Sequence, residues 1–212
     1  AAVVAVLNNN LSEFSSSFAA EDLVLKENAE ALQFSVNEGS WVSVSLLPDG
    51  ESFFFDLLGD IYHLNIEGGI AEPITAGMGF DSQPVVSPNG EKIAFISDRD
   101  GKDNLWIANV DGSDPLKLSN ETYAYLISPT WSPDGQNIIV TKRTREIELV
   151  QYHIEGGTGV VITQHDESDA TKKSPGVGAT FSPDGKYIYF AERLGGPDAP
   201  TDEFPVTQIV RL

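Results

Sequence analysis

The stretch SPNGEKIAFISDRDGKDNLWI, residues 87–107, decides the fold of this chain. It opens with Pro-Asn-Gly at residues 88–90, a combination that favours a tight turn. Proline fixes φ at the first corner, asparagine tolerates the second, and glycine accepts the positive φ that follows. Ile93 and Phe95 then stand two residues apart, so both side chains point to one face of a strand. The stretch therefore predicts a strand that begins directly after a hairpin turn.

The same turn occurs four times along the chain, at unequal spacings of 40, 45 and 50 residues. Unequal spacings around a constant turn indicate loops of different length attached to one repeated unit. The four turns are Leu47-Pro48-Asp49-Gly50, Ser87-Pro88-Asn89-Gly90, Ser132-Pro133-Asp134-Gly135 and Ser182-Pro183-Asp184-Gly185. An apolar pair two residues apart follows each of them: Phe53 and Phe55, Ile93 and Phe95, Ile138 and Val140, and Ile188 and Phe190.

A second series of residues recurs with a constant step of 44. Its members are three turns that contain glycine, three pairs that end in a hydroxyl residue, and three single aliphatic residues. The turns are Ile66-Glu67-Gly68-Gly69, Val110-Asp111-Gly112-Ser113 and Ile154-Glu155-Gly156-Gly157. The pairs are Ile74-Thr75, Leu118-Ser119 and Ile162-Thr163, and the aliphatic residues are Ile61, Leu105 and Leu149. Three positions that keep one register over three copies indicate a true repeat.

Four short strands in about 44 residues, repeated in tandem, are typical of a propeller blade. The sequence predicts an all-β fold, a β-propeller of four-stranded antiparallel blades that is incomplete, with three blades and most of a fourth. The blades are expected at about residues 41–80, 81–125, 126–170 and 177–212, within a partial propeller at 32–212. Residues 32–36 are a candidate closing strand for the last blade. An open ring exposes strand edges and apolar faces, so we expect the remaining blades to lie downstream in a longer polypeptide.

Composition limits the classes of partner. The chain has 212 residues, a net charge of −19 and no cysteine, which excludes disulfides and cysteine-based metal sites. The negative charge makes nucleic acid and anionic membrane poor partners. Residues 1–31 form an N-terminal segment, a possible signal-peptide remnant and linker, because residues 1–7 are small and apolar and Ser17-Phe18-Ala19 suits a signal peptidase. We therefore expect a periplasmic or secreted protein with no membrane span.

The sequence predicts no catalytic or metal-binding residue in this chain. The histidines His63, His153 and His165 form no His-x-His pair, so they are interpreted as structural or surface residues. Residues 98–103 contain three aspartates, but Gly101 and Lys102 do not fit the EF-hand pattern. A hairpin turn with a local Asp–Arg pair is the preferred interpretation of that segment.

The remaining motifs have structural interpretations. Gly156-Gly157-Thr158-Gly159 lacks the Gly-Lys-Ser/Thr that a phosphate-binding loop needs, and no Gly-x-Ser-x-Gly nucleophile turn occurs. Trp41, Trp106 and Trp131 are expected in the core or between blades. Long insertions at residues 165–177 and 194–207 are candidate contact surfaces for another domain, or passive excursions.

The pattern of residues 87–107 resembles the repeat of the TolB-type propeller, also described as WD40-like or PD40. Three further segments, at residues 55–62, 77–84 and 204–211, are similar to the N-terminal propeller of large bacterial amidohydrolases, over about residues 33–212. This resemblance implies a non-catalytic module of a larger exported protein that acts in domain docking or substrate access. A divalent metal is then expected only in a downstream hydrolase domain, so no catalytic, cofactor or metal residue is carried over onto this chain.

Two other functions fit the same repeats, because a fold does not determine a function. One is a TolB-like periplasmic scaffold that contacts other envelope proteins. The other is the gating propeller of a serine peptidase. The expected partners are accordingly the remaining blades and a downstream domain of the same polypeptide, or envelope proteins.

Overall fold

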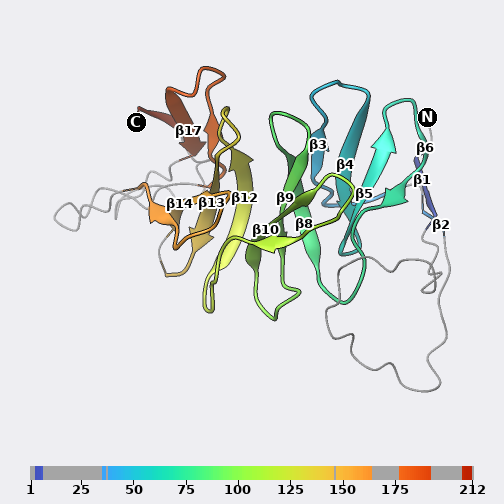
Figure 1. Ribbon diagram of the computed structural model, residues 1–212, viewed down its shortest axis with the longest axis horizontal. Helices are drawn as coiled ribbons and strands as arrows, with labels where there is room; N and C mark the ends of the chain where they lie inside the picture. The colour runs from blue at the N-terminus through green and yellow to red at the C-terminus, as the bar shows by residue number, and fades with distance from the viewer. Residues whose placement is uncertain are drawn as a thin grey trace, which may run out of the picture. The chain divides into compact units, whose positions relative to one another are not determined.

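The computed structural model describes residues 3–6, 35–36, 38–145, 147–163, 177–191 and 207–211, and every regular element in these ranges is a strand (Figure 1). The predicted fold class is confirmed: the chain is all-β and forms several four-stranded sheets in which neighbouring strands follow one another in the chain. It divides into two compact units, of which the first comprises residues 1–102 and 106–116 and the second residues 103–105 and 117–212. Each unit is described by itself.

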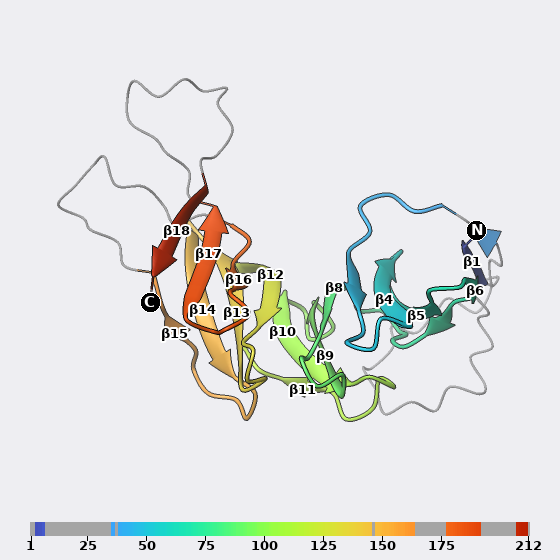
Figure 2. The same ribbon diagram turned by 90° about the horizontal axis from the view of Figure 1, so that it is seen from above.

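Four sheets have the strand order expected of successive blades. The first sheet contains β3 (Val44–Leu46), β4 (Ser52–Leu57), β5 (Asp60–Asn65) and β7 (Glu72–Pro73). The second contains β8 (Asp81–Val86), β9 (Lys92–Ser97), β10 (Asn104–Asn109) and β11 (Leu116–Lys117). The third contains β12 (Tyr125–Trp131), β13 (Asn137–Arg143), β14 (Ile147–His153) and β15 (Val160–Val161). The fourth contains β16 (Thr180–Phe181), β17 (Tyr187–Ala191) and β18 (Thr207–Arg211), which lie side by side in Figure 2.

A small additional sheet lies beside the first blade. β1 (Val3–Val6) pairs with β2 (Ser35–Val36) in antiparallel orientation and with β6 (Gly69–Ile70) in parallel orientation. The pairing of Ser35 and Val36 with β1 differs from the expectation that residues 32–36 close the last blade. Residues 32–34 lie outside the described part of the chain, as do residues 7–31 of the predicted N-terminal segment.

The turns between the first two strands of each blade have the predicted conformation. Their glycines, at positions 50, 90, 135 and 185, have φ values of 73°, 74°, 69° and 70°. Each glycine N–H donates to the carbonyl three residues earlier at 2.9 Å. In the last three turns the serine hydroxyl also donates to the side chain of Asn89, Asp134 or Asp184. The same hydroxyl accepts the N–H of the residue five positions later, so the hairpin is closed from both sides.

The 44-residue repeat corresponds to a two-bond clasp between the third strand and the residues after the fourth. The N–H of Ile74 donates to the carbonyl of Ile61 at 2.7 Å, and the Thr75 hydroxyl accepts the N–H of Ile61 at 2.9 Å. Ser119 and Thr163 accept the N–H groups of Leu105 and Leu149 in the same way, at 2.8 and 3.1 Å. Ile61, Leu105 and Leu149 are fully buried, so each hydroxyl satisfies the amide of a residue that water does not reach.

Successive blades pack face to face within each unit. In the first unit, Phe54 and Ile61 of the first blade contact Ile93, Phe95 and Ala108 of the second. In the second unit, Ile139 and Leu149 of the third blade contact Ala179, Ile188 and Phe190 of the fourth. The opposite face of the first blade buries Phe55, Tyr62, Leu64 and Ala71. The predicted alternation of side chains along a strand is confirmed in β4, because Phe54 packs against the second blade and Phe55 lies on the opposite face of the first.

We expect Thr75→Val to lower the free energy of unfolding by about 1–3 kcal/mol, because the buried N–H of Ile61 then has no acceptor. Thr75→Ser keeps the hydroxyl and is the matched control, with an expected loss of under about 1 kcal/mol. Urea unfolding of the 212-residue chain measures both variants. A loss for Val no larger than the loss for Ser would show that the hydrogen bond contributes no more than the methyl group at this position.

Candidate functional site

Three loops of the first unit meet at one end of the first two blades. They are the turn at residues 58–59, the linker at 77–80 and the turn at 98–103. The N–H of Asp81 donates to the carbonyl of Gly59 at 2.7 Å, and the N–H of Phe80 donates to Oδ1 of Asp98 at 2.6 Å. A Cβ atom on Gly79 would lie 2.8 Å from Cβ of Arg99, so the linker passes directly over that side chain. The three loops are therefore held against one another.

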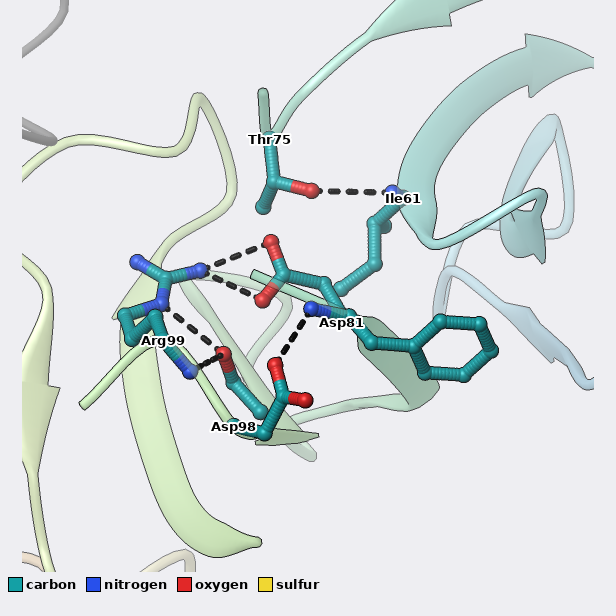
Figure 3. A network of polar contacts seen from close by, with 7 residues as sticks. Ile61, Thr75, Asp81, Asp98 and Arg99 are labelled. Carbon is teal, nitrogen blue, oxygen red and sulfur yellow. Dashed lines mark hydrogen bonds and ion pairs between the residues drawn. The ribbon is translucent and has the colours of Figure 1, made fainter. Parts of the chain in front are cut away.

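Arg99 is the centre of this junction (Figure 3). Its guanidinium group binds both carboxylate oxygens of Asp81, at 2.8 and 2.7 Å, and its Nε and backbone N–H donate to the Ser97 hydroxyl. The guanidinium carbon also lies 5.0 Å from the ring centroids of Phe95 and Trp106. The side chains of Arg99 and Asp81 are only 11% and 2% exposed, so this is a largely buried ion pair, in which the single nitrogen Nη2 binds both carboxylate oxygens.

The sequence placed Arg99 in a local pair with an aspartate of its own turn. The structure shows a pair between Arg99 and Asp81, 18 residues earlier in the chain. Asp98, its neighbour in the turn, accepts the N–H of Phe80. The reason is geometric: β8 and β9 pair in antiparallel orientation with Asp81 opposite Ser97, so the end of β9 lies next to the start of β8.

Asp60 lies close enough to this ion pair to be affected by it. The pKa of Asp60 is raised from 3.8 to about 7, first by burial and then by the neighbouring Asp81 carboxylate, while Arg99 partly opposes the shift. Oδ1 of Asp60 is buried and has no hydrogen-bond partner, and the same holds for Nε1 of Trp106. Asp60 and Trp106, each with a buried polar atom that lacks a partner, thus both lie beside the Arg99–Asp81 pair.

Exposed apolar side chains stand on two of these loops, the turn at residues 58–59 and the linker at 77–80. Leu58, Met78 and Phe80 are 65%, 55% and 60% exposed, and we call these three residues the Phe80 surface. A Cβ atom on Gly59 would lie 3.1 Å from the ring of Phe80, so the ring rests on that glycine. Exposed apolar groups on rigid loops are typical of contact surfaces for another protein or domain. The charged groups of Arg99, Asp81 and Asp98 are engaged in contacts that hold the loops together.

A further contact between blades escaped sequence analysis. The carboxylate of Asp56 accepts the N–H groups of Ser43 and Gln83, both at 2.7 Å, and so joins the first blade to the second. Gln83 lies at a β-bulge and has a φ of 55°. A glutamine in the sequence does not predict a positive φ, so the bulge could not be located from the sequence. In the second unit the hydroxyl of Thr141 accepts the N–H of Gly178 at 3.3 Å.

The predicted histidine and glycine positions are spread over the structure. His63 lies in β5 with its ring centroid 5.1 Å from that of Phe54. His153 is exposed at the end of β14, and its Nδ1 accepts the N–H of Glu155. Gly156-Gly157-Thr158-Gly159 leads into strand β15 and not into a helix, which argues against a phosphate-binding loop. His165 lies outside the described residues, and so do most of the insertions at 165–177 and 194–207.

The tryptophans behave differently from one another. Trp106 packs against the core between the first two blades, and Trp131 is buried, as predicted. The prediction for Trp41 is wrong, since its side chain is 99% exposed. Trp41 precedes β3 and has φ of 62°, so it lies outside the sheets that would cover it.

The described part of the chain also bears on metal binding and on membrane crossing. Within it, no group of three or more His, Asp or Glu side chains is arranged to hold a metal ion. The same residues contain no helix of the length and hydropathy that a membrane crossing requires.

Comparisons with known proteins agree with the fold. The sequence profile of the PD40 family, described as the TolB beta propeller domain, matches residues 26–199. An uncharacterised protein of Agrobacterium fabrum is 28% identical over 151 residues, which are 65% of this chain and 50% of that protein. An uncharacterised peptidase of Bacillus subtilis is 32% identical over 169 residues, 65% of this chain and 25% of the peptidase. The crystal structure of a TolB described as putative, from Agrobacterium tumefaciens, has a TM-score of 0.62 at 22% identity, over 75% of this chain and 56% of that one. The chain thus spans half or less of the length of these two sequence relatives.

We expect Arg99→Gln to lower the free energy of unfolding by about 3 kcal/mol, because it leaves the buried Asp81 carboxylate without its cation. Lys186→Gln removes an exposed ion pair, Lys186–Asp184 at 3.2 Å, and should cost under about 0.5 kcal/mol. Chemical unfolding of both variants makes the comparison. Similar losses would mean that Arg99 contributes no more than a surface ion pair.

The raised pKa of Asp60 predicts a pH dependence of stability. Between its ordinary value of 3.8 and about 7, the folded chain holds a proton that the unfolded chain releases, so the free energy of unfolding falls as pH rises. Asp60→Asn removes this dependence. The variant should gain about 1–2 kcal/mol relative to the natural chain between pH 5 and pH 8, a figure reduced for partial exposure. Urea unfolding at the two pH values tests this, and an unchanged difference would contradict the raised pKa.

Proposed function

The chain belongs to the TolB beta propeller domain family, and on that premise we propose that it is a non-catalytic propeller module of a larger exported protein. In this proposal the Phe80 surface docks another domain of that protein or shapes substrate access to it. The observation that carries the proposal is an exposed apolar surface, Leu58, Met78 and Phe80, on loops held by a buried Arg99–Asp81 ion pair. An ion pair that holds solvent-exposed loops in place is expected where the position of those loops is needed for binding.

An amidohydrolase parent is the first candidate. It rests on the resemblance of residues 55–62 and 77–84 to the propellers of that family. These two segments contain the Phe80 surface together with Asp60 and Asp81, whereas Arg99 lies outside them. The complete reading frame should then contain a His-x-His pair after a strand, downstream of the propeller.

A serine peptidase parent is the second candidate. The observation that favours it is the 32% identity to a protein of Bacillus subtilis named as a peptidase. In that case the reading frame contains Gly-x-Ser-x-Gly downstream, and the propeller controls access to the peptidase site. A TolB-like scaffold for envelope proteins is the third candidate, in which the reading frame ends soon after the ring closes.

We also propose a periplasmic or secreted location. The support is the apolar start of the chain followed by Ser17-Phe18-Ala19, together with the acidic net charge of −19. Fractionation of cells that express the complete reading frame tests this location directly.

Hydrogen exchange measures the docking role. The amides of residues 58–60 and 77–81 should exchange at least tenfold more slowly in the full-length protein than in the isolated 212-residue chain, because a docked domain excludes water. Phe80→Asp should remove this protection, since a charge on an apolar contact is costly. The matched control is Val160→Asp, which changes a valine of similar exposure, 66%, in β15. Equal exchange in the two proteins would refute docking at this surface.

A further inference from the structure

A concave site lies within the first unit, toward the end of the first blade opposite Leu58. It is a cleft of about 700 Å³, a size typical of ligand sites. Residues of both blades line it: Leu47, Ser52, Phe54, His63, Glu72, Pro73 and Ile74 come from the first blade, and Val110 and Asp111 from the second. The Phe80 surface shares none of these residues, so the cleft is a separate feature.

The walls of the cleft are fixed by a close contact between backbones. A Cβ atom on Gly112 would lie 2.3 Å from the carbonyl oxygen of Ile74, so only glycine permits this approach, and its φ is 82°. The equivalent Gly68 has nothing within 4 Å of its Cβ position. The turn after β10 is thus seated on the first blade, and the cleft beside it is preformed.

The floor of the cleft is apolar and belongs to the packed core. Phe54 is 1% exposed and is part of the cluster between the blades. Leu47, Ile74 and Val110 are half-buried members of the same region. Half-buried aliphatic groups on a rigid floor favour a ligand with an apolar side chain, at about 25 cal/mol for each Å² that is covered.

The rim of the cleft is acidic. Glu72 and Asp111 are both exposed and come from different blades. The Ser113 hydroxyl and N–H donate to Asp111 at 2.6 and 2.9 Å and hold the pKa of that carboxyl below its usual value, so it stays ionised. The residues that line the cleft include no lysine or arginine to balance the two carboxylates. A cationic group is the charge complement of this rim.

We propose that this cleft binds an extended peptide segment in which a leucine or phenylalanine stands two residues from a lysine or arginine, because such side chains point to the same side of an extended chain. The apolar side chain covers Leu47, Ile74 and Val110, and the cation lies between Glu72 and Asp111. An extended segment suits the site because β7, which contains Glu72 and Pro73, is the terminal strand of its sheet. The proposal does not depend on which larger protein contains the propeller.

The probe is a fluorescent tetrapeptide, acetyl-Leu-Phe-Arg-Lys-amide, titrated with the 212-residue chain and followed by fluorescence anisotropy. We expect saturable binding. A peptide with Glu-Glu in place of Arg-Lys should bind at least tenfold more weakly, and so should one with Ser-Ser in place of Leu-Phe. Benzyltrimethylammonium, which carries a cation and a ring without a peptide backbone, should compete at least tenfold less well than the unlabelled peptide.

Glu72→Lys should weaken binding of the tetrapeptide at least fivefold. The matched control is Glu67→Lys, which makes the same charge change in the exposed turn of the first blade that corresponds to the Asp111 turn of the second. This control should change the dissociation constant less than twofold. Asp111→Asn is a second variant that should weaken binding, and circular dichroism checks that all three chains are folded.

Several results would overturn the proposal: absence of saturable binding, equal binding of the Ser-Ser peptide, equal competition by benzyltrimethylammonium, or equal weakening by Glu67→Lys and Glu72→Lys. The last would indicate only the attraction of any cation to a chain of net charge −19. None of these results bears on the Phe80 surface, whose test is hydrogen exchange in the full-length protein.

Discussion

A blade of this protein is apolar on both faces, and the structure is organised by the need to cover both. In the first blade, Phe54 and Ile61 point to one side, while Phe55 and Tyr62 point to the other. A sheet of this kind cannot leave either face in water without losing several kcal/mol for each large side chain. It must therefore stack on a neighbour, which explains why the sequence repeats and why blades adjacent in the chain pack together within each unit.

Stacking also determines where polar groups can be placed. The N–H of Gln83 is paired with Asp56 of the preceding blade, and that of Val86 with the hydroxyl of Ser45. These bonds satisfy backbone groups that the packing of one blade on the next removes from water. They also set the relative position of the two sheets more precisely than apolar contact alone, because a hydrogen bond tolerates only a narrow range of distances.

The Arg99–Asp81 pair shows the same principle at the loop end of the blades. Removal of both charges from water is costly, and the cost is offset by two hydrogen bonds between them, by Ser97, and by the rings of Phe95 and Trp106. Asp60 adds a further carboxylate that burial disfavours. The junction thus combines a largely buried ion pair, a carboxylate that burial disfavours, and exposed apolar side chains on two of its loops.

The sequence by itself determined the strands, their turns and their faces. Glycines 50, 90, 135 and 185 dictate the hairpins through their positive φ, and the period of two in each second strand dictates which side chains are buried; both rules act over a few residues. The tertiary structure alone decided that Arg99 pairs with Asp81, that Asp56 reaches Gln83, and that Trp41 is exposed. It also assembled the Phe80 surface and the acidic cleft, which join residues of different loops and blades. No local pattern records such contacts, because they arise only when one apolar sheet is laid on the next.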